Sequence, residues 1–144
     1  MGVSSCYLLL EVKQRKEFIM RIVERMHKTN VICTDEPGAG GACHEYSIVK
    51  ENNPFKNTIS DSLKEGILTS IHFQNGPILE NGRNGCTNED LIIIVVDRLN
   101  GFQSGEFSCR ENAIARTKLE EALMWLNKRT SDRLKRGVEG RSIV

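Results

Sequence analysis

The feature that most constrains the fold is a long amphipathic segment near the C-terminus, "ENAIARTKLEEALMWLNKRTSDRLKRG", residues 111–137. Its small and apolar residues recur at helical spacing and form one stripe. The stripe consists of Ala115, Leu119, Ala122, Leu123, Leu126 and Leu134. Ser108 is the predicted N-cap, with Glu111 three residues later in a capping box, and Gly137 is the predicted end. The segment therefore predicts one long helix.

A second helix is predicted just before it, although the apolar run "LIIIVVDRL" (91–99) is by itself equally compatible with a buried strand. Thr87 and Asp90 form a capping-box pair ahead of the run, and its apolar pattern continues through Phe102; both features favour a helix. Two helices joined by the Gly-containing turn "NGFQSGEF" predict an antiparallel hairpin. Because the apolar stripe is long for the available core, we expect the hairpin to pack on another chain, with about 1.5–3 kcal/mol from each buried Leu.

The N-terminal half predicts a small antiparallel sheet with one helix. The segment "KQRKEFIMRIVERMHK" (13–28) places Phe18, Ile22 and Met26 at helical spacing. Three short runs predict strands: Val31–Ile32, "HEYSIVKE" (44–51) and "ILTSIHF" (67–73). The expected class is α+β, with a sheet region over residues 1–85 and a helical hairpin over 86–144 that mediates oligomerisation, together forming one compact domain.

Composition excludes several classes of function. The net charge of +1 over 144 residues gives no global field for binding DNA or a membrane surface. No apolar run reaches membrane-span length, and no signal peptide is evident. The five cysteines are odd in number and scattered, which predicts reduced thiols in a cytosol rather than a disulfide framework.

Most candidate motifs for chemistry are weak. The glycines of "PGAGGA" (37–42) lack the Lys-Ser/Thr and the following helix of a phosphate-binding loop, so they predict a hairpin loop. Cys43 and His44, together with Cys33, Cys86 or His72, have no metal-ligand spacing, and we predict no metal site and no cofactor. The same Cys and His residues are compatible with a nucleophilic pair, but nothing in the sequence brings them together.

The stretch "HFQNGPILENGRNGCTNEDL" (72–91) is the best candidate for a binding site. Its glycines form turns, while Phe73 offers a ring for stacking a base and the amides of Gln74, Asn75, Asn84 and Asn88 offer donors and acceptors. The helix that starts after Thr87 presents free N–H groups to an anion. Arg98 and Arg110 bracket this helix and are suited to phosphate. These ingredients predict a nucleotide site without catalytic residues.

Several blocks of the sequence carry a resemblance to a known family. They are "FQNGP", "NGCTNEDL", "DRLNGFQ", "CREN", "TKLEEALMWL" and "RLKRGVEG", in this order, with "DEPGAGGACHEY" as a looser match upstream. Over about residues 31–141 the chain resembles the phage Thoeris anti-defence sponge family. The helical hairpin of that family is shared with the phage sponge that counters CBASS immunity.

The resemblance implies a binding protein, not an enzyme, in the cytoplasm of an infected bacterial host. Its ligand is glycocyclic ADP-ribose, with a 1''-2' or 1''-3' linkage, which TIR enzymes make from NAD and which the sponge captures intact. The family also implies a homodimer, or a hexamer built as a trimer of dimers, and a second site for cyclic di- or trinucleotides.

Roles for single residues follow from combining the resemblance with the chemistry of the loop. We predict that Phe73 stacks on adenine, that Asn75, Asn84 and Asn88 bind ribose and base edges, and that Arg98 and Arg110 bind the pyrophosphate. Arg110 stands in the "CREN" block. The candidates for the second, cyclic-oligonucleotide site are Arg129, Arg133 and Arg136.

Two alternatives of other classes stay open at this point. One is an enzyme that cleaves or transfers a nucleotide signal with His44 or His72. The other is a scaffold that binds nucleic acid through the basic C-terminal end, for which the near-neutral total charge is unfavourable.

Overall fold

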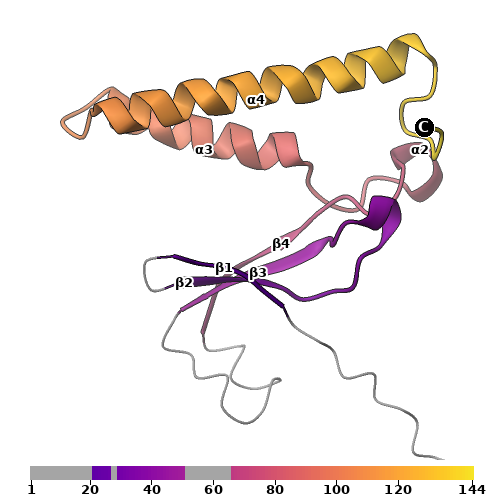
Figure 1. Ribbon diagram of the computed structural model, residues 1–144, viewed down its shortest axis with the longest axis horizontal. Helices are drawn as coiled ribbons and strands as arrows, with labels where there is room; N and C mark the ends of the chain where they lie inside the picture. Colours follow the sequence, from indigo (N-terminus) through magenta and orange to yellow (C-terminus); the bar gives the residue numbers. More distant parts are fainter. Residues whose placement is uncertain (1–20, 27–28, 51–65) are drawn as a thin grey trace, which may run out of the picture.

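The computed structural model describes residues 21–26, 29–50 and 66–144, in two arms joined by a loop (Figure 1). One arm is a β-sheet and the other is a helical hairpin, which confirms the α+β class. The elements in order are β1 (Arg21–Met26), β2 (Thr29–Cys33), the 3-10 turn η1 (Ala39–Gly41), β3 (Glu45–Lys50), β4 (Ile67–His72), α2 (Ile78–Asn81), α3 (Asn88–Gln103) and α4 (Arg110–Lys135).

The sheet has four strands in the order β1-β2-β3-β4, and every neighbouring pair is antiparallel. The three predicted strands are confirmed as β2, β3 and β4. Ile32, Cys33 and Val49 are the buried apolar side chains of the described residues, and all lie on the central strands β2 and β3. Within the described part of the chain, the buried core is therefore small and lies in the sheet.

The helix predicted over residues 13–28 is wrong where the structure describes that segment. Arg21–Met26 forms strand β1 and pairs with β2, with Ile22 opposite Ile32. Pairing with β2 supplies hydrogen-bond partners for the backbone of this segment. The β-branched pair at 22 and 23 also favours a strand. Residues 13–20 and 27–28 lie outside the described part.

The two predicted helices of the hairpin are confirmed, and so is the capping box of α3. The Thr87 side chain accepts from the Asp90 amide, and Asp90 Oδ2 accepts from Thr87 N at 2.8 Å. The predicted N-cap of α4 is off by one residue. Cys109 rather than Ser108 caps it, because the Ser108 amide bonds to the Gly105 carbonyl at 3.2 Å as part of the interhelical turn. The helix accordingly starts at Arg110.

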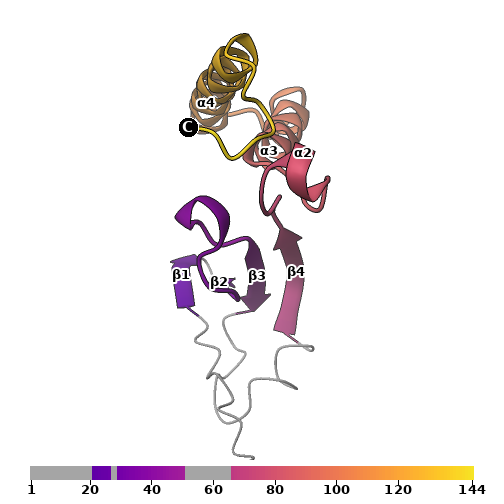
Figure 2. The same ribbon diagram turned by 90° about the vertical axis from the view of Figure 1, so that its right-hand side faces the viewer.

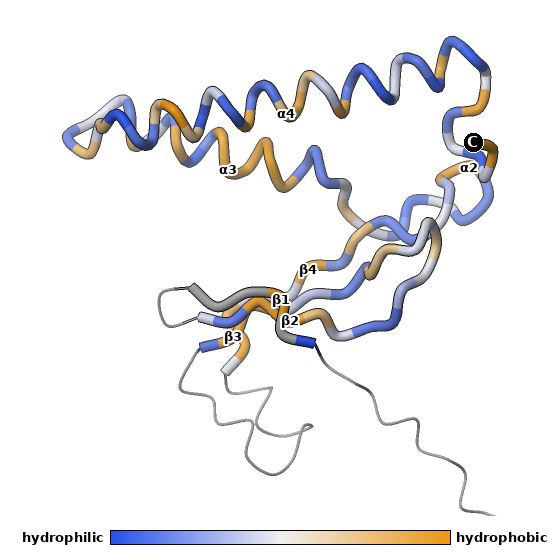
Figure 3. Tube along the Cα trace, viewed as in Figure 1, coloured by the Kyte–Doolittle hydropathy of each residue, from blue (hydrophilic) through white to orange (hydrophobic). Residues whose placement is uncertain are grey.

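The hairpin exposes much apolar surface. Neither α3 nor α4 contains a buried residue, although apolar residues occur along both helices (Figure 3). Ile94 on α3 is 62% exposed and Trp125 on α4 is 60% exposed. Isolated exposed apolar residues are ordinary, but several large ones on both helices of a hairpin are typical of an interaction surface. None of the described helices is sufficiently long and apolar to span a lipid bilayer.

The C-terminal tail folds back from the end of α4 and passes beside α2 before the chain ends (Figures 1 and 2). Gly137 has a φ of 68° and ends the helix, as predicted. The Leu79 amide donates to the Gly140 carbonyl at 3.0 Å, and Ser142 Oγ donates to the Glu80 carboxylate at 2.7 Å. Hydrogen bonds from the Ser142 hydroxyl and from the Ser142 main-chain amide hold the pKa of Glu80 below its usual value. The tail thereby fastens α2 to the end of α4.

Arg133 organises this tail. Its guanidinium donates to the Glu139 carboxylate at 2.9 Å and to three main-chain carbonyls, those of Val138, Arg141 and Ile143. Only 15% of the side chain is exposed. These charge-assisted hydrogen bonds use the Arg133 guanidinium to hold the tail in place.

Arg133→Gln is expected to lower the free energy of unfolding by about 1.5–3 kcal/mol, because charge-assisted hydrogen bonds are lost. Arg129→Gln, an exposed position on the same helix, serves as the matched control and should change it by less than ~0.5 kcal/mol. Urea denaturation followed by circular dichroism measures both. Equal stability of the two variants would contradict this role.

Candidate functional site

The loop predicted as the binding site is closed at its base by main-chain bonds. Phe73 forms a parallel bridge with Cys86, the Gln74 amide donates to the Cys86 carbonyl at 2.7 Å, and the Cys86 amide donates to the His72 carbonyl at 2.9 Å. The loop therefore leaves β4 and returns beside it before α3 begins. It lies where the two arms of the molecule meet (Figure 1).

Gly85 permits this closure. A Cβ atom at residue 85 would lie 2.4 Å from the main-chain carbon of Phe73 and 2.6 Å from the Gln74 nitrogen. No side chain fits at such distances unless the two backbone segments move apart. The glycine is thus required by a close approach of two main chains.

Gly85→Ala is expected to destabilise the protein by about 1–3 kcal/mol through this overlap, and to impair ligand binding by displacing the loop. The matched control is Gly101→Ala on α3, where an added Cβ meets nothing within 4 Å. Helix propensity predicts that the control gains about 0.5–1 kcal/mol. Thermal unfolding measures both substitutions, and a stable Gly85→Ala protein with an unchanged loop would contradict the account.

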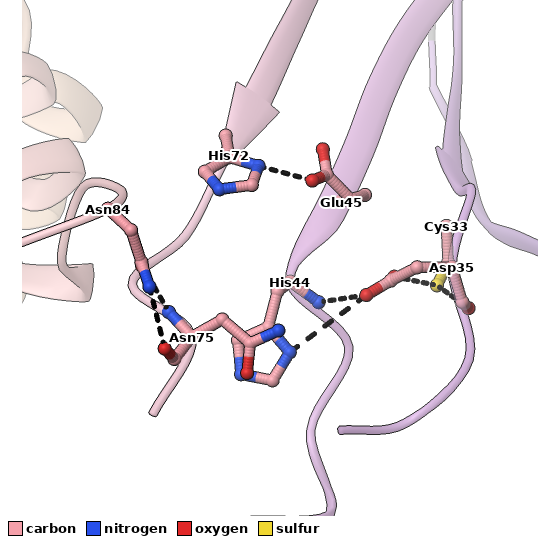
Figure 4. Close-up of polar contacts among 7 residues, drawn as sticks. All are labelled: Cys33, Asp35, His44, Glu45, His72, Asn75 and Asn84. Carbon is pink, nitrogen blue, oxygen red and sulfur yellow. Dashed lines mark hydrogen bonds and ion pairs between the residues drawn. The ribbon is translucent and has the colours of Figure 1, made fainter. Parts of the chain in front are cut away.

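Two side-chain amides hold the shape of the loop. Asn84 binds both main-chain groups of Asn75: its Oδ1 accepts from the Asn75 amide and its Nδ2 donates to the Asn75 carbonyl, each at 2.8 Å (Figure 4). Gln74 Nε2 donates to the Gly82 carbonyl at 2.8 Å, and its Oε1 accepts from the Asn84 amide at 3.0 Å. Asn84 and Gln74 thus serve the loop itself, while Asn75 is exposed at its rim. The support role of Gln74 was not predicted, since nothing in the sequence distinguishes it from a ligand-binding amide.

Phe73 is held by an aromatic neighbour that the sequence analysis missed. Its ring lies edge-to-face on Tyr46 of β3, with centroids 5.6 Å apart and an interplanar angle of 87°. Burial raises the pKa of the Tyr46 hydroxyl, so this ring is neutral at physiological pH. A supported aromatic ring that is still partly exposed suits stacking on a base.

The start of α3 is less free for an anion than predicted. The hydrogen bonds from Thr87 hold the pKa of Asp90 below its usual value, so a carboxylate already stands at this helix end. The neighbouring Asn88, the first residue of α3, is exposed and lies next to the loop. The amide of Asn88 therefore stays a candidate for ligand contact, whereas the dipole of α3 is partly offset by Asp90.

The predicted arginines lie far from the loop within one chain. Arg98 is about 15 Å from Asn88 along the axis of α3 and stacks over Phe102, with its guanidinium carbon 5.0 Å from the ring centroid. Arg110 is the exposed first residue of α4, directly after the interhelical turn. Figure 1 places this turn at the opposite end of α3 from the loop.

The predicted ligand-binding residues therefore form two groups. The loop group consists of Phe73, Asn75, Asn84 and Asn88, and the turn group consists of Arg98 and Arg110. No single chain brings the two groups together. A site that uses both must take them from different chains.

The predicted second site lies at the far end of α4. Arg129 and Arg136 are exposed, whereas Arg133 is committed to the tail in this structure. The residues share the C-terminal end of the helix, where the dipole favours cations and the local charge is positive. Their role in binding a cyclic oligonucleotide remains a prediction.

The two histidines of the enzymatic alternative lie in different surroundings (Figure 4). His72 on β4 is half-exposed and pairs with the carboxylate of Glu45 on β3. His44 is only 6% exposed, which keeps it from direct contact with a substrate. Neither geometry places a described thiol or hydroxyl nucleophile beside an accessible histidine.

Comparison with known proteins finds a family match in the second half of the chain. Residues 66–131, which include β4, the loop, α3 and most of α4, match the model of the Acb2/Tad1 hairpin domain. This part of the chain is therefore similar to the Acb2/Tad1 hairpin domain. A curated protein named Thoeris anti-defense 1, from Bacillus phage SBSphiJ7, is 59% identical over 88 residues. The match covers 61% of this chain and 61% of that relative.

The resemblance to the phage Thoeris anti-defence family is thus confirmed. The match to the hairpin domain begins before the loop and includes both the loop group and the turn group. The two groups therefore belong to one domain type even though a single chain holds them apart.

Proposed function

We propose that this protein is a phage anti-defence sponge that binds glycocyclic ADP-ribose and keeps it intact, so that Thoeris immunity is not triggered. The name of the related phage protein supports the anti-defence part. The captured signal would be the 1''-2' or 1''-3' isomer, and the protein would act in the cytoplasm of the infected host. Neither DNA nor a membrane is proposed as a partner.

One structural observation supports the proposal independently of the relative's name. The loop group and the turn group have complementary binding chemistry, but they lie apart within a single chain. The loop group offers an aromatic ring and amides for a nucleoside, and the turn group offers two cations for a pyrophosphate. In an antiparallel pair of hairpins, the turn of one chain lies near the loop of its partner. The pocket would then form between two protomers.

The exposed apolar residues of the hairpin support such pairing. A homodimer, or a hexamer made of three dimers, would cover side chains such as Ile94 and Trp125. Walls from two chains also enclose a small ligand more completely than one chain does. Capture at nanomolar concentration needs about −12 kcal/mol, which requires near-complete enclosure and several charge-assisted bonds.

The proposal is tested by calorimetry with glycocyclic ADP-ribose. We expect a stoichiometric, exothermic titration with a dissociation constant in the nanomolar range. Absence of binding at micromolar concentration would overturn the proposal. A parallel titration with cyclic di- and trinucleotides tests the second site, at which Arg129 and Arg136 are the exposed cations.

The enzymatic alternative makes a different prediction. A nucleotide-cleaving enzyme that uses His72 would convert the ligand, and His72→Ala would abolish turnover while binding persisted. For the sponge, we expect no product from the unaltered protein and no change in ligand chemistry in the variant. Chromatography of the nucleotide before and after incubation separates the two.

A further inference from the structure

Three potential metal ligands converge where the connection between β2 and β3 begins and ends. Cys33 closes β2, Asp35 follows it, and Cys43 lies just before β3. One ligand atom from each residue lies within 4.8 Å of the other two. Cys33 is 1% exposed, and its Sγ approaches Asp35 Oδ1 at 3.4 Å. The cluster is therefore partly sealed from water and brings two thiols to one carboxylate.

His44 provides a second, independent observation. It is 6% exposed, and its Nδ1 is buried without a hydrogen-bond partner among the described residues. This nitrogen points toward Asp35, 3.9 Å from Oδ2, while the His44 main-chain amide donates to the same oxygen at 2.8 Å (Figure 4). A buried ring nitrogen without a partner is costly, and an ion beside Asp35 would give it one.

We propose that Cys33, Cys43 and Asp35 bind a zinc-type divalent ion, with His44 Nδ1 as the fourth ligand. Thiolate and imidazole select zinc over the hard ions magnesium and calcium. A tetrahedral zinc ion spaces its sulfur and oxygen ligands about 3.5–3.8 Å apart, so small side-chain rotations bring Cys33, Cys43 and Asp35 to this spacing. His44 lies outside this cluster of three, with its Nδ1 3.9 Å from Asp35 Oδ2, and its ring must turn further to complete the tetrahedron. This proposal departs from the sequence-based prediction of no metal site: Cys33, Cys43 and His44 lack a metal-ligand spacing in the sequence, and Asp35 was not among the candidates considered there.

The proposed ion would join the two ends of the loop over residues 34–44 and stiffen it. That loop reaches the candidate nucleotide site: a Cβ added at Gly38 would lie 3.2 Å from His44 Nδ1 and 3.6 Å from Asn75 Oδ1. A fixed loop would form one wall beside Asn75, a consequence that rests on the proposed function. Metal binding itself does not depend on it.

The test uses full-length protein stripped with a chelator and titrated with Co²⁺, then with Zn²⁺. We expect stoichiometric binding, a thiolate-to-cobalt charge-transfer band in the ultraviolet and its loss when Zn²⁺ displaces Co²⁺. Cys43→Ser should weaken binding at least ~100-fold, since loss of an outer-shell partner alone costs about 10–100-fold. Cys109→Ser, a conservative change at the exposed N-cap of α4, is the matched control and should leave the affinity unchanged.

Asp35→Asn is a second variant that removes a proposed ligand but should still fold, so the test does not depend on the folding of Cys43→Ser. The amide oxygen of an asparagine at residue 35 still accepts a hydrogen bond from the His44 main chain. We expect this variant to keep its circular dichroism spectrum and to lose metal affinity. A cobalt complex without the charge-transfer band, equal affinity in Cys43→Ser, or a Cys33–Cys43 disulfide in place of bound metal would each overturn the proposal. These readouts contain no nucleotide, so they stand apart from the calorimetric test of the sponge.

Discussion

Arg110→Ala is expected to weaken binding of glycocyclic ADP-ribose by at least ~2 kcal/mol, or about 30-fold in the dissociation constant. Arg110 is exposed at the first position of α4, so its removal should change the free energy of unfolding by less than ~0.5 kcal/mol. The loss arises because a guanidinium binds a pyrophosphate through two parallel charge-assisted hydrogen bonds. Calorimetry and urea denaturation measure the two quantities separately.

The matched control is Lys118→Ala, which removes an equal charge from the same helix. Lys118 is exposed and pairs only with Glu121 nearby, at 2.9 Å, among the contacts of the described residues. We expect the control to bind with nearly unchanged affinity. Unchanged affinity in Arg110→Ala as well would show that the turn group is not the phosphate site.

Arg110→Ala, mixed with a second variant, also tests whether the pocket lies between two chains. Phe73→Ala removes the loop group's ring, and Arg110→Ala removes the turn group's cation. If one site needs Phe73 of one chain and Arg110 of another, subunit exchange between the two inactive variants restores about a quarter of the sites, in mixed dimers. If both residues act within one chain, the mixture stays as weak as its components.

Trp125→Glu should have the second large effect, on assembly. Trp125 is 60% exposed on the single chain, and buried tryptophans at interfaces commonly contribute about 2–4 kcal/mol. A carboxylate there should dissociate the oligomer and, with it, abolish high-affinity ligand binding, while leaving the helical circular dichroism signal in place. Native mass spectrometry gives the assembly state.

Asn127→Glu is the control for assembly, because residue 127 is exposed and lies about 200° around the helix from residue 125. It should leave the oligomer intact. Ile94→Asp on α3, at a position 62% exposed, provides a second probe of the apolar surface. An unaltered protein that is monomeric at working concentration, with ligand bound, would contradict the two-chain pocket.

Local sequence signals predicted most of the fold. The Thr87–Asp90 capping box, the long apolar stripe of α4 and Gly137 fixed the hairpin, and the alternating runs fixed β2 to β4. The exception is β1, where Ile22 and Val23 are compatible with either a helical stripe or a short strand. Pairing with β2 decides the matter, and a long-range contact of this kind has no local signature.

The candidate site was predicted in composition but not in arrangement. The sequence identified the loop, its aromatic residue and the arginines, but it did not show that Arg98 and Arg110 lie at the far end of α3. Residues that support others were equally hidden: Asn84 and Gln74 look like ligand-binding amides until their main-chain partners are known. Such roles depend on which backbone groups need partners, and the folded loop determines that.

The central claim is that the protein takes up a nucleotide messenger and keeps it unchanged. The most direct measurement is to load the purified protein with the product mixture of a TIR enzyme, remove free nucleotide, denature by heat and identify what is released. The account predicts stoichiometric release of intact glycocyclic ADP-ribose by mass spectrometry. Release of a hydrolysed product, or of no nucleotide at all, would contradict it.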